Sequence, residues 1–244
     1  MIVDVSNNNG RVDWDQAARH VEGAMGKASE GVTFRDGYFQ ANRAACKQRE
    51  LLFGGYHYGR VGSPLTGQLE TFLGMLDGGP RGGELPAALD IEWEGNRGQE
   101  PERVRWFVLE FLSRLEELTD AVPMLYSASA YLTETGLDRV EELGRFPLWL
   151  ASWRETVPRA PWPWHEVTLW QYTSRGSVPG ITGAVDCNRL LVPRERIVVA
   201  GALPGPTPPP AWFKPWARWR RARPAAAPER IPGWAWRRLR ELLR

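Results

Sequence analysis

Short apolar segments alternate along the chain with segments in which apolar residues recur every three or four positions. The apolar segments lie at residues 2–6, 24–29, 51–58, 85–93, 121–127, 146–152, 166–172 and 184–188. Runs of this length, rich in Val, Ile, Leu and aromatic residues, are typical of strands that are buried on both faces. The pattern therefore predicts about eight strands.

Amphipathic helices are predicted between most of these strands. The clearest helix covers 101–118, where the apolar positions follow helical spacing: Val104, Phe107, Val108, Phe111, Leu115 and Leu118. Shorter helices are predicted from Asp13, over 38–50, and after Ser63 and Pro64, a pair that suits an N-cap and a first-turn proline.

The order of these elements predicts the fold. Strands that alternate with helices run parallel, with the helices packed outside them. Eight such strands in a chain of 244 residues predict an α/β fold, a TIM-like β/α barrel. The last three predicted strands leave almost no room for helices between them, so we expect an irregular barrel. Active sites in such barrels lie at the carboxyl ends of the strands.

The composition changes at about residue 201. We predict a barrel domain over 1–200, a proline-rich linker over 201–211, and a basic tail rich in Pro, Trp and Arg over 212–244. One Lys and nine Arg against two Glu give residues 204–244 a formal charge of +8. Because the whole chain carries +2, residues 1–203 carry −6.

Several functions fit the tail. Interleaved Trp and Arg are typical of segments that bind anionic surfaces, so the partner we favour is an anionic cell-wall polymer or a membrane surface. The tail could instead dock on the acidic barrel domain, or be an extension without function. Nucleic acid could bind through phosphate contacts and stacked bases, but the acidic barrel argues against it, and we expect no nucleic-acid partner.

Composition also disfavours several classes of site. Cys46 and Cys187 form no CxxC pair, and the three histidines are too dispersed for a zinc motif. We therefore expect no metal and no cofactor, and we favour two separate buried thiols over a disulfide. No run of 18 apolar residues is present, and the first residues lack the pattern of a secretory signal. We expect a protein that is made in the cytoplasm.

The strongest candidate for chemistry is the segment ALDIEW at 88–93. On a strand, Asp90 and Glu92 would share one face, about 6.6–6.8 Å apart. Two carboxyl groups this close repel each other, and the pKa of one usually rises. A general acid that faces an ionised carboxylate uses this arrangement. The alternative is an acidic strand end that is solvated and without a chemical role.

Other polar residues fall near predicted strand ends: Asp4, Tyr56, His57, Tyr126 and Gln171. Because the carboxyl ends of barrel strands meet at one face, we expect these residues to converge with Asp90 and Glu92. This convergence favours the active-site interpretation. His57 is interpreted as a hydrogen-bonded core or rim residue rather than an acid–base group.

With these motifs, residues 1–193 resemble glycoside hydrolase family 25, the lysozymes that cleave peptidoglycan as N-acetylmuramidases. The resemblance rests on blocks in the family's order: VDVSNNNGRVDWDQ at the start, GKASEGVTFRDGYFQAN at 26–42, GGYHYGR at 54–60, ALDIEW at 88–93, PMLYSA at 123–128, LWLASW at 148–153 and LWQYTSRGSVPGITGAVDCNRL at 169–190. The chain departs from the family at 7–9, where three Asn replace the Trp or Gln that often follows the DVS block.

The resemblance implies a catalytic set of four carboxyl residues: Asp4, Asp90, Glu92 and Asp186. Glu92 would be the general acid that protonates the leaving glycosidic oxygen, and Asp90 its ionised partner. Asp4 and Asp186 would tune the charge and orient the substrate. The resemblance also implies sugar-contacting positions: Tyr56, Tyr126, Trp153 and Gln171. Glu30 could line the cleft or cap a turn and is left out of the catalytic set.

Three mechanisms stay open for the carboxyl pair: a direct nucleophile, an inverting water, or attack by the substrate's own 2-acetamido group with Asp90 orienting its N–H. We favour the third. Two rivals to this enzyme are a divalent-metal site held by the four acids and a non-catalytic protein that binds walls or permeabilises membranes. The implied partner is bacterial peptidoglycan, reached by a phage-encoded protein or one that lysis releases.

Overall fold

The computed structural model describes residues 1–199, and the predicted linker and tail over 201–244 lie outside the described residues. Eight strands form a closed ring, which confirms the predicted barrel. Its strands are β1 (Ile2–Val5), β2 (Gly23–Glu30), β4 (Leu52–Tyr58), β5 (Ala88–Asp90), β6 (Met124–Ala128), β7 (Leu148–Ala151), β8 (Leu169–Gly176) and β9 (Val185–Leu190). The short strand β3 (Phe34–Arg35) pairs with β2 outside the ring.

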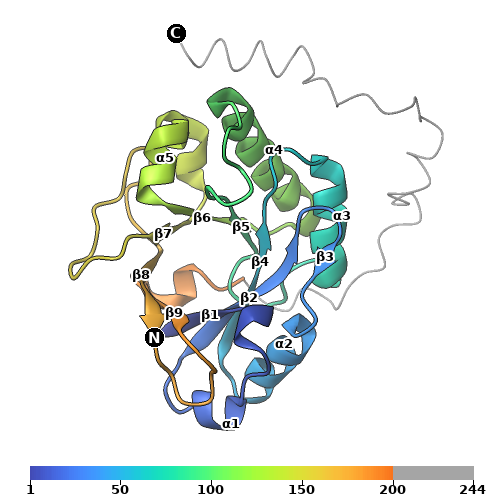
Figure 1. The fold of residues 1–244 in the computed structure, drawn as a ribbon, viewed down its shortest axis with the longest axis vertical. Coiled ribbons are helices and arrows are strands. Elements are labelled where there is room, and N and C mark those ends of the chain that lie inside the picture. The colour runs from blue at the N-terminus through green and yellow to red at the C-terminus, as the bar shows by residue number, and fades with distance from the viewer. Residues whose placement is uncertain (200–244) are drawn as a thin grey trace, which may run out of the picture.

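Helices surround the ring on the outside (Figure 1). They are α1 (Trp14–Ala17), α2 (Phe39–Gln48), α3 (Leu65–Met75), α4 (Pro101–Thr119) and α5 (Ser129–Thr135), with short 3-10 turns at Asn7–Asn9, Leu137–Arg139, Glu141–Arg145 and Arg194–Arg196. No helix among residues 1–199 is both long and apolar enough to cross a bilayer.

The barrel is irregular in its last part, as the sequence predicts. No helix lies within the described segment 152–184, which connects β7, β8 and β9. β9 runs antiparallel to both of its neighbours, β8 and β1. The residues between β8 and β9 are too few for the crossover that parallel strands need, so the chain reverses direction and closes the ring antiparallel.

Alternate residues of each strand face opposite sides of the sheet. Ile2, Met25 and Trp149 belong to one apolar cluster, which fills the barrel interior. Their strand neighbours Val3 and Ala24 belong to a second cluster, which lies between the strands and the helices. The predicted site residues that share a strand face with the interior cluster therefore point into the barrel.

Two adjacent glycines let β4 pack closely on both sides. A Cβ on Gly54 would lie 2.7 Å from Sδ of Met25, and a Cβ on Gly55 would lie 2.8 Å from Cδ2 of Leu76. Both distances are shorter than a van der Waals contact. Larger residues at 54 and 55 would therefore push β4 away from its neighbours.

Three local predictions need correction. The strand predicted over 85–93 is restricted to Ala88–Asp90, so Glu92 follows the strand rather than continuing it. Leu118 is 40% exposed, because α4 turns it away from the core near the end of the helix. Pro64 occupies the N-cap position of α3 without a side-chain hydrogen bond, so Ser63 does not cap this helix.

The cysteines and His57 have the structural roles that the sequence predicts. Cys46 and Cys187 are both free and buried. His57 faces the helices, and its ring stacks on Phe111 of α4 at 5.3 Å between centroids. Its Nδ1 lies 2.9 Å from Oγ of Ser29, and its Nε2 lies 3.1 Å from Oε1 of Gln68. Burial lowers the pKa of His57 to about 4.

This lowered pKa predicts a pH dependence of stability. Between pH 6.5 and about 4 the unfolded chain binds more protons at His57 than the folded chain does, so the free energy of unfolding falls as the pH falls through this window. Replacing His57 with Gln removes this contribution. We expect the stability difference between wild type and His57→Gln to shrink by about 3 kcal/mol from pH 7 to pH 4, measured by urea denaturation. A difference that is constant with pH would contradict the assignment.

Candidate active site

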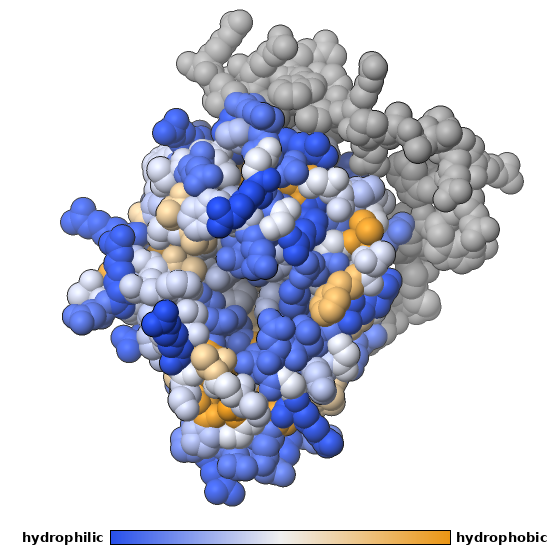
Figure 2. Space-filling model, in the orientation of Figure 1, coloured by the Kyte–Doolittle hydropathy of each residue, from blue (hydrophilic) through white to orange (hydrophobic). Residues whose placement is uncertain are grey.

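The four predicted carboxyl residues converge inside one end of the barrel. Asp4 lies on β1, Asp186 on β9, Asp90 at the carboxyl end of β5, and Glu92 two residues beyond it. Asp4 and Asp90 are almost completely buried. In the view along the barrel, Figure 2 shows a hollow near the middle of the face, bordered mainly by hydrophilic residues.

Asp4 and Asp186 form the first carboxyl pair. They are direct partners in the β1–β9 ladder, and the charge of Asp186 acts on Asp4. Asp4 also accepts from Nδ2 of Asn188 at 2.7 Å and from Nε2 of Gln171 at 3.2 Å. Burial, followed by the charge of Asp186, raises the pKa of Asp4 well above its usual range. The pair therefore retains a proton to higher pH than two exposed aspartates would.

Asp90 and Glu92 form the second pair, two residues apart where β5 ends. Burial raises the pKa of both carboxyl groups, and the charge of Glu92 adds to the effect on Asp90. Two buried carboxyl groups this close do not both ionise readily, so the pair keeps a proton to higher pH than two exposed carboxyl groups would. Oδ1 of Asp90 is buried and has no hydrogen-bond partner among the described residues.

Two buried polar side chains fix the backbone that carries this pair. Oγ of Ser127, on β6, donates to the carbonyl oxygen of Ile91 at 2.8 Å. Nδ2 of Asn96 donates to the carbonyl oxygens of Glu92 and Gly59, at 3.0 and 2.9 Å. These bonds hold the chain at the point where it leaves β5. Glu92 is thereby fixed next to Asp90 even though the strand has ended.

The residues predicted to contact sugar surround the two pairs. Gln171 connects them to the rim, because its Oε1 accepts from the hydroxyl of Tyr126 and from Nε1 of Trp153, each at 3.2 Å. Trp153 is 65% exposed. Tyr56 and Tyr126 are buried deeper, and both rings pack on the edge of Trp149. Their contact with sugar stays a prediction.

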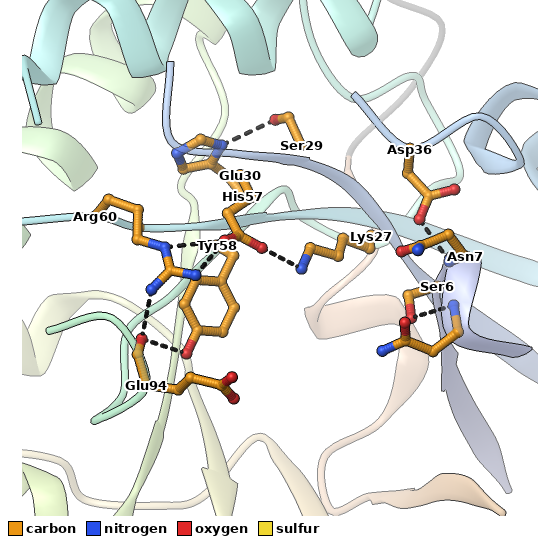
Figure 3. A network of polar contacts seen from close by, with 12 residues as sticks. Ser6, Asn7, Lys27, Ser29, Glu30, Asp36, His57, Tyr58, Arg60 and Glu94 are labelled. Carbon is orange, nitrogen blue, oxygen red and sulfur yellow. Dashed lines mark hydrogen bonds and ion pairs between the residues drawn. The ribbon is translucent and has the colours of Figure 1, made fainter. Parts of the chain in front are cut away.

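Sequence reasoning missed several residues of the site. Asn188 accepts from Nε1 of Trp149 at 2.7 Å while it donates to Asp4, so it links the aromatic layer to the carboxyl groups. Lys27 faces the interior from β2 and contacts Glu30 (Figure 3). In the sequence, only the alternation of inward- and outward-facing residues along β2 and β9 could have indicated that Lys27 and Asn188 face the barrel interior.

The acids do not gather in the way that a metal site requires. Within residues 1–199, no group of three or more His, Cys, Asp or Glu side chains is placed to hold a metal ion together. The carboxyl groups are instead paired with each other or with amide donors. Paired carboxyl groups with raised pKa values at the open end of an α/β barrel suit a glycoside hydrolase, which needs one acid that keeps its proton beside an ionised carboxylate.

Comparison with known proteins indicates the same class of enzyme. The sequence model of the glycosyl hydrolases family 25 matches residues 3–181. The chain belongs to this family and is a glycoside hydrolase. Among solved structures, a bacterial lysozyme from Streptomyces coelicolor has a TM-score of 0.73 and 27% identity, with 80% of this chain and 93% of that one covered. A family GH25 lysozyme from Aspergillus fumigatus has a TM-score of 0.69 and 26% identity, with 81% and 98% covered.

Curated relatives agree with the structural matches. The uncharacterised protein YegX of Escherichia coli K12 is 31% identical over 193 residues, which cover 76% of this chain and 67% of that protein. Lysozyme M1 of Streptomyces globisporus is 27% identical over 194 residues, which cover 77% of this chain and 66% of that protein. The predicted family, fold and enzyme class are therefore confirmed.

Proposed function

We propose that this enzyme hydrolyses peptidoglycan at the β-1,4 bond between N-acetylmuramic acid and N-acetylglucosamine. Its family supports a peptidoglycan hydrolase, since relatives bear the names lysozyme and muramidase. The observation that carries the proposal is the buried Asp90–Glu92 pair, in which burial raises the pKa of both carboxyl groups. Glycoside hydrolysis needs such a proton for the leaving oxygen and a negative group beside the oxocarbenium-like transition state.

Glu92 is the general acid in this proposal, and Asp90 is its ionised partner. The unpartnered Oδ1 of Asp90 suits a hydrogen bond from the 2-acetamido N–H of the sugar. Such a bond favours the ionised form of Asp90. The proton that the pair keeps then belongs to Glu92, which donates it to the leaving oxygen.

The remaining residues adjust charge and position. Asp4 and Asp186 carry negative charge that acts on the Asp90–Glu92 pair and on a developing positive ring. Trp153 is the most exposed of the predicted sugar contacts and presents a flat apolar face at the rim. Tyr126 and Gln171 connect that rim to Asp4, so a sugar that packs on Trp153 is aligned with the carboxyl groups.

The pair also favours one stereochemical course. An inverting enzyme separates its two carboxyl groups by about 6.5–9.5 Å to admit a water, and a direct nucleophile needs about 5–5.5 Å. The sequence estimate of separation assumed that both residues lie in a strand, but β5 ends at Asp90, so that estimate does not apply to Glu92. The unpartnered Oδ1 of Asp90 can accept the N–H of the substrate's own acetamido group, which supports attack by that group with overall retention of configuration.

Replacing Glu92 with Gln removes the proton and keeps the shape. We expect the rate of cleavage of purified cell walls to fall by about 10²–10⁴-fold, with little change in melting temperature. The matched control is Glu117→Gln, an exposed position on α4, which we expect to retain full activity. Lysis of walls at the wild-type rate by Glu92→Gln would favour the rival non-catalytic wall-binding or membrane-permeabilising protein.

Retention is tested by the configuration of the new reducing end. We expect proton NMR of a soluble glycan fragment, recorded within the first turnovers, to show the β-anomer before mutarotation. Mass spectrometry of the digested wall should place N-acetylmuramic acid at that reducing end. An α-anomer formed first would exclude both the acetamido route and a covalent glycosyl–enzyme.

We also propose that the basic tail anchors the enzyme to an anionic wall polymer or membrane surface. This proposal rests on sequence alone: a charge of +8 and five Trp over 204–244, against −6 over 1–203. The acidic barrel by itself is repelled by an anionic wall. A tethered cationic segment offsets that repulsion.

Deletion of residues 204–244 tests the tail. We expect weaker binding to whole cells at low salt, because the cationic contacts are lost, and unchanged cleavage of soluble glycan fragments. Sedimentation of cells with bound protein measures the first, and reducing-sugar release measures the second. Equal binding of full-length and truncated protein across a salt series would contradict the proposal.

A further inference from the structure

Glu30 lies at the carboxyl end of β2, close to the site, and its carboxylate is shared by two cations. Its Oε2 accepts from Nζ of Lys27 at 2.6 Å, and its Oε1 accepts from Nε of Arg60 at 2.9 Å and also from Nη2 of Arg60 (Figure 3). The three side chains together carry one net positive charge. Neither the catalytic set nor the predicted sugar contacts include any of them.

Further contacts fix the two cations. Nη1 of Arg60 donates to the carbonyl oxygen of Glu94 at 2.9 Å, and the hydroxyl of Tyr58 donates to the same oxygen at 2.8 Å. The Lys27 ammonium lies 4.9 Å from the centre of the Tyr58 ring, and the Arg60 guanidinium lies 4.8 Å from it. In the ladder, Tyr58 is the partner of Asp90. The cluster is therefore one strand away from the acid pair.

The position of the Lys27 ammonium matters to that pair. Charged groups that act on Asp90 or Glu92 from the surrounding strands and loops are Asp4, Asp186, Glu94 and Lys27, and three of these are acidic. Lys27 is a cation that acts on both carboxyl groups and lowers the pKa of each. Its long side chain could reach them if Glu30 did not hold it.

We propose that Glu30 is a positioning residue, which holds the Lys27 ammonium at the end of β2 and keeps it from pairing directly with Asp90 and Glu92. Arg60 fixes the Glu30 carboxylate so that it can do this. These three side chains are only 14–28% exposed, so losing their ion pairs would also lower stability. A merely structural role would lower stability without moving the pKa of the acid pair, and the pH profile separates the two roles. The inference deepens the proposed function, since it explains how the general acid keeps its proton.

The test is the pH profile of Glu30→Gln, which keeps the shape and removes the charge. We expect the alkaline limb of kcat/KM to move to lower pH by about 1 unit, because the released ammonium stabilises the ionised pair. Lys27→Met should move the limb the other way, and Glu30→Gln should have little further effect in the Lys27→Met background. The control is Glu110→Gln, which breaks a comparable ion pair with Arg114 on α4 and should leave the limb in place.

A second readout does not depend on catalysis. Carbon NMR of labelled Asp and Glu carboxyl groups follows the titration of Asp90 and Glu92 in the full chain without substrate. We expect Glu30→Gln to lower the titration midpoint of the pair by a similar amount. If the midpoint does not move, or moves equally without Lys27, the positioning role is wrong. If the midpoint moves and the kinetic limb does not, the positioning role stands and the proposed role of the pair as the acid is wrong.

Discussion

Four carboxyl groups inside one end of a closed barrel are the constraint on which the rest of this structure depends. Closure of the ring pairs β1 with β9 and so places Asp4 opposite Asp186, while β5 brings Asp90 and Glu92 into the same interior. Burial makes it unfavourable for all four to be ionised together. The groups form two close pairs, each of which holds a proton more strongly than an exposed carboxyl group does.

The scaffold treats the two pairs differently. Asp4 receives two amide donors, from Asn188 and Gln171, and these partly offset the cost of burying its charge. Asp90 has a buried oxygen with no such partner within the described chain. An unpaired buried acceptor is costly, so it persists only if the surrounding structure enforces it. Ser127 and Asn96 supply that enforcement by fixing the backbone on either side of Glu92. The unsatisfied position is the one that a substrate N–H can fill.

The charged and titratable side chains near the two carboxyl pairs are also positioned by specific contacts. Lys27 is held by Glu30, and Glu30 by Arg60, so the nearby positive charge is kept at the rim instead of neutralising the acids. His57 lies on the other face of β4, where burial keeps it neutral and removes it from the chemistry. The active end of the barrel is thus negative and proton-rich. Both properties suit a reaction that donates a proton and develops a positive ring.

The sequence by itself determined the eight strands, the outer helices and the convergence of Asp4, Asp90 and Glu92, because hydrophobic period and strand-end polarity are local properties of the sequence. Asp186 joined this set only through the resemblance to the family. Only the tertiary structure decided the antiparallel direction of β9, the end of β5 at Asp90, and the partners that Asn188, Asn96 and Lys27 find across the barrel. These features depend on which strands become neighbours when the ring closes. No local pattern encodes that choice, because residues up to 186 positions apart in the chain meet only in the folded ring.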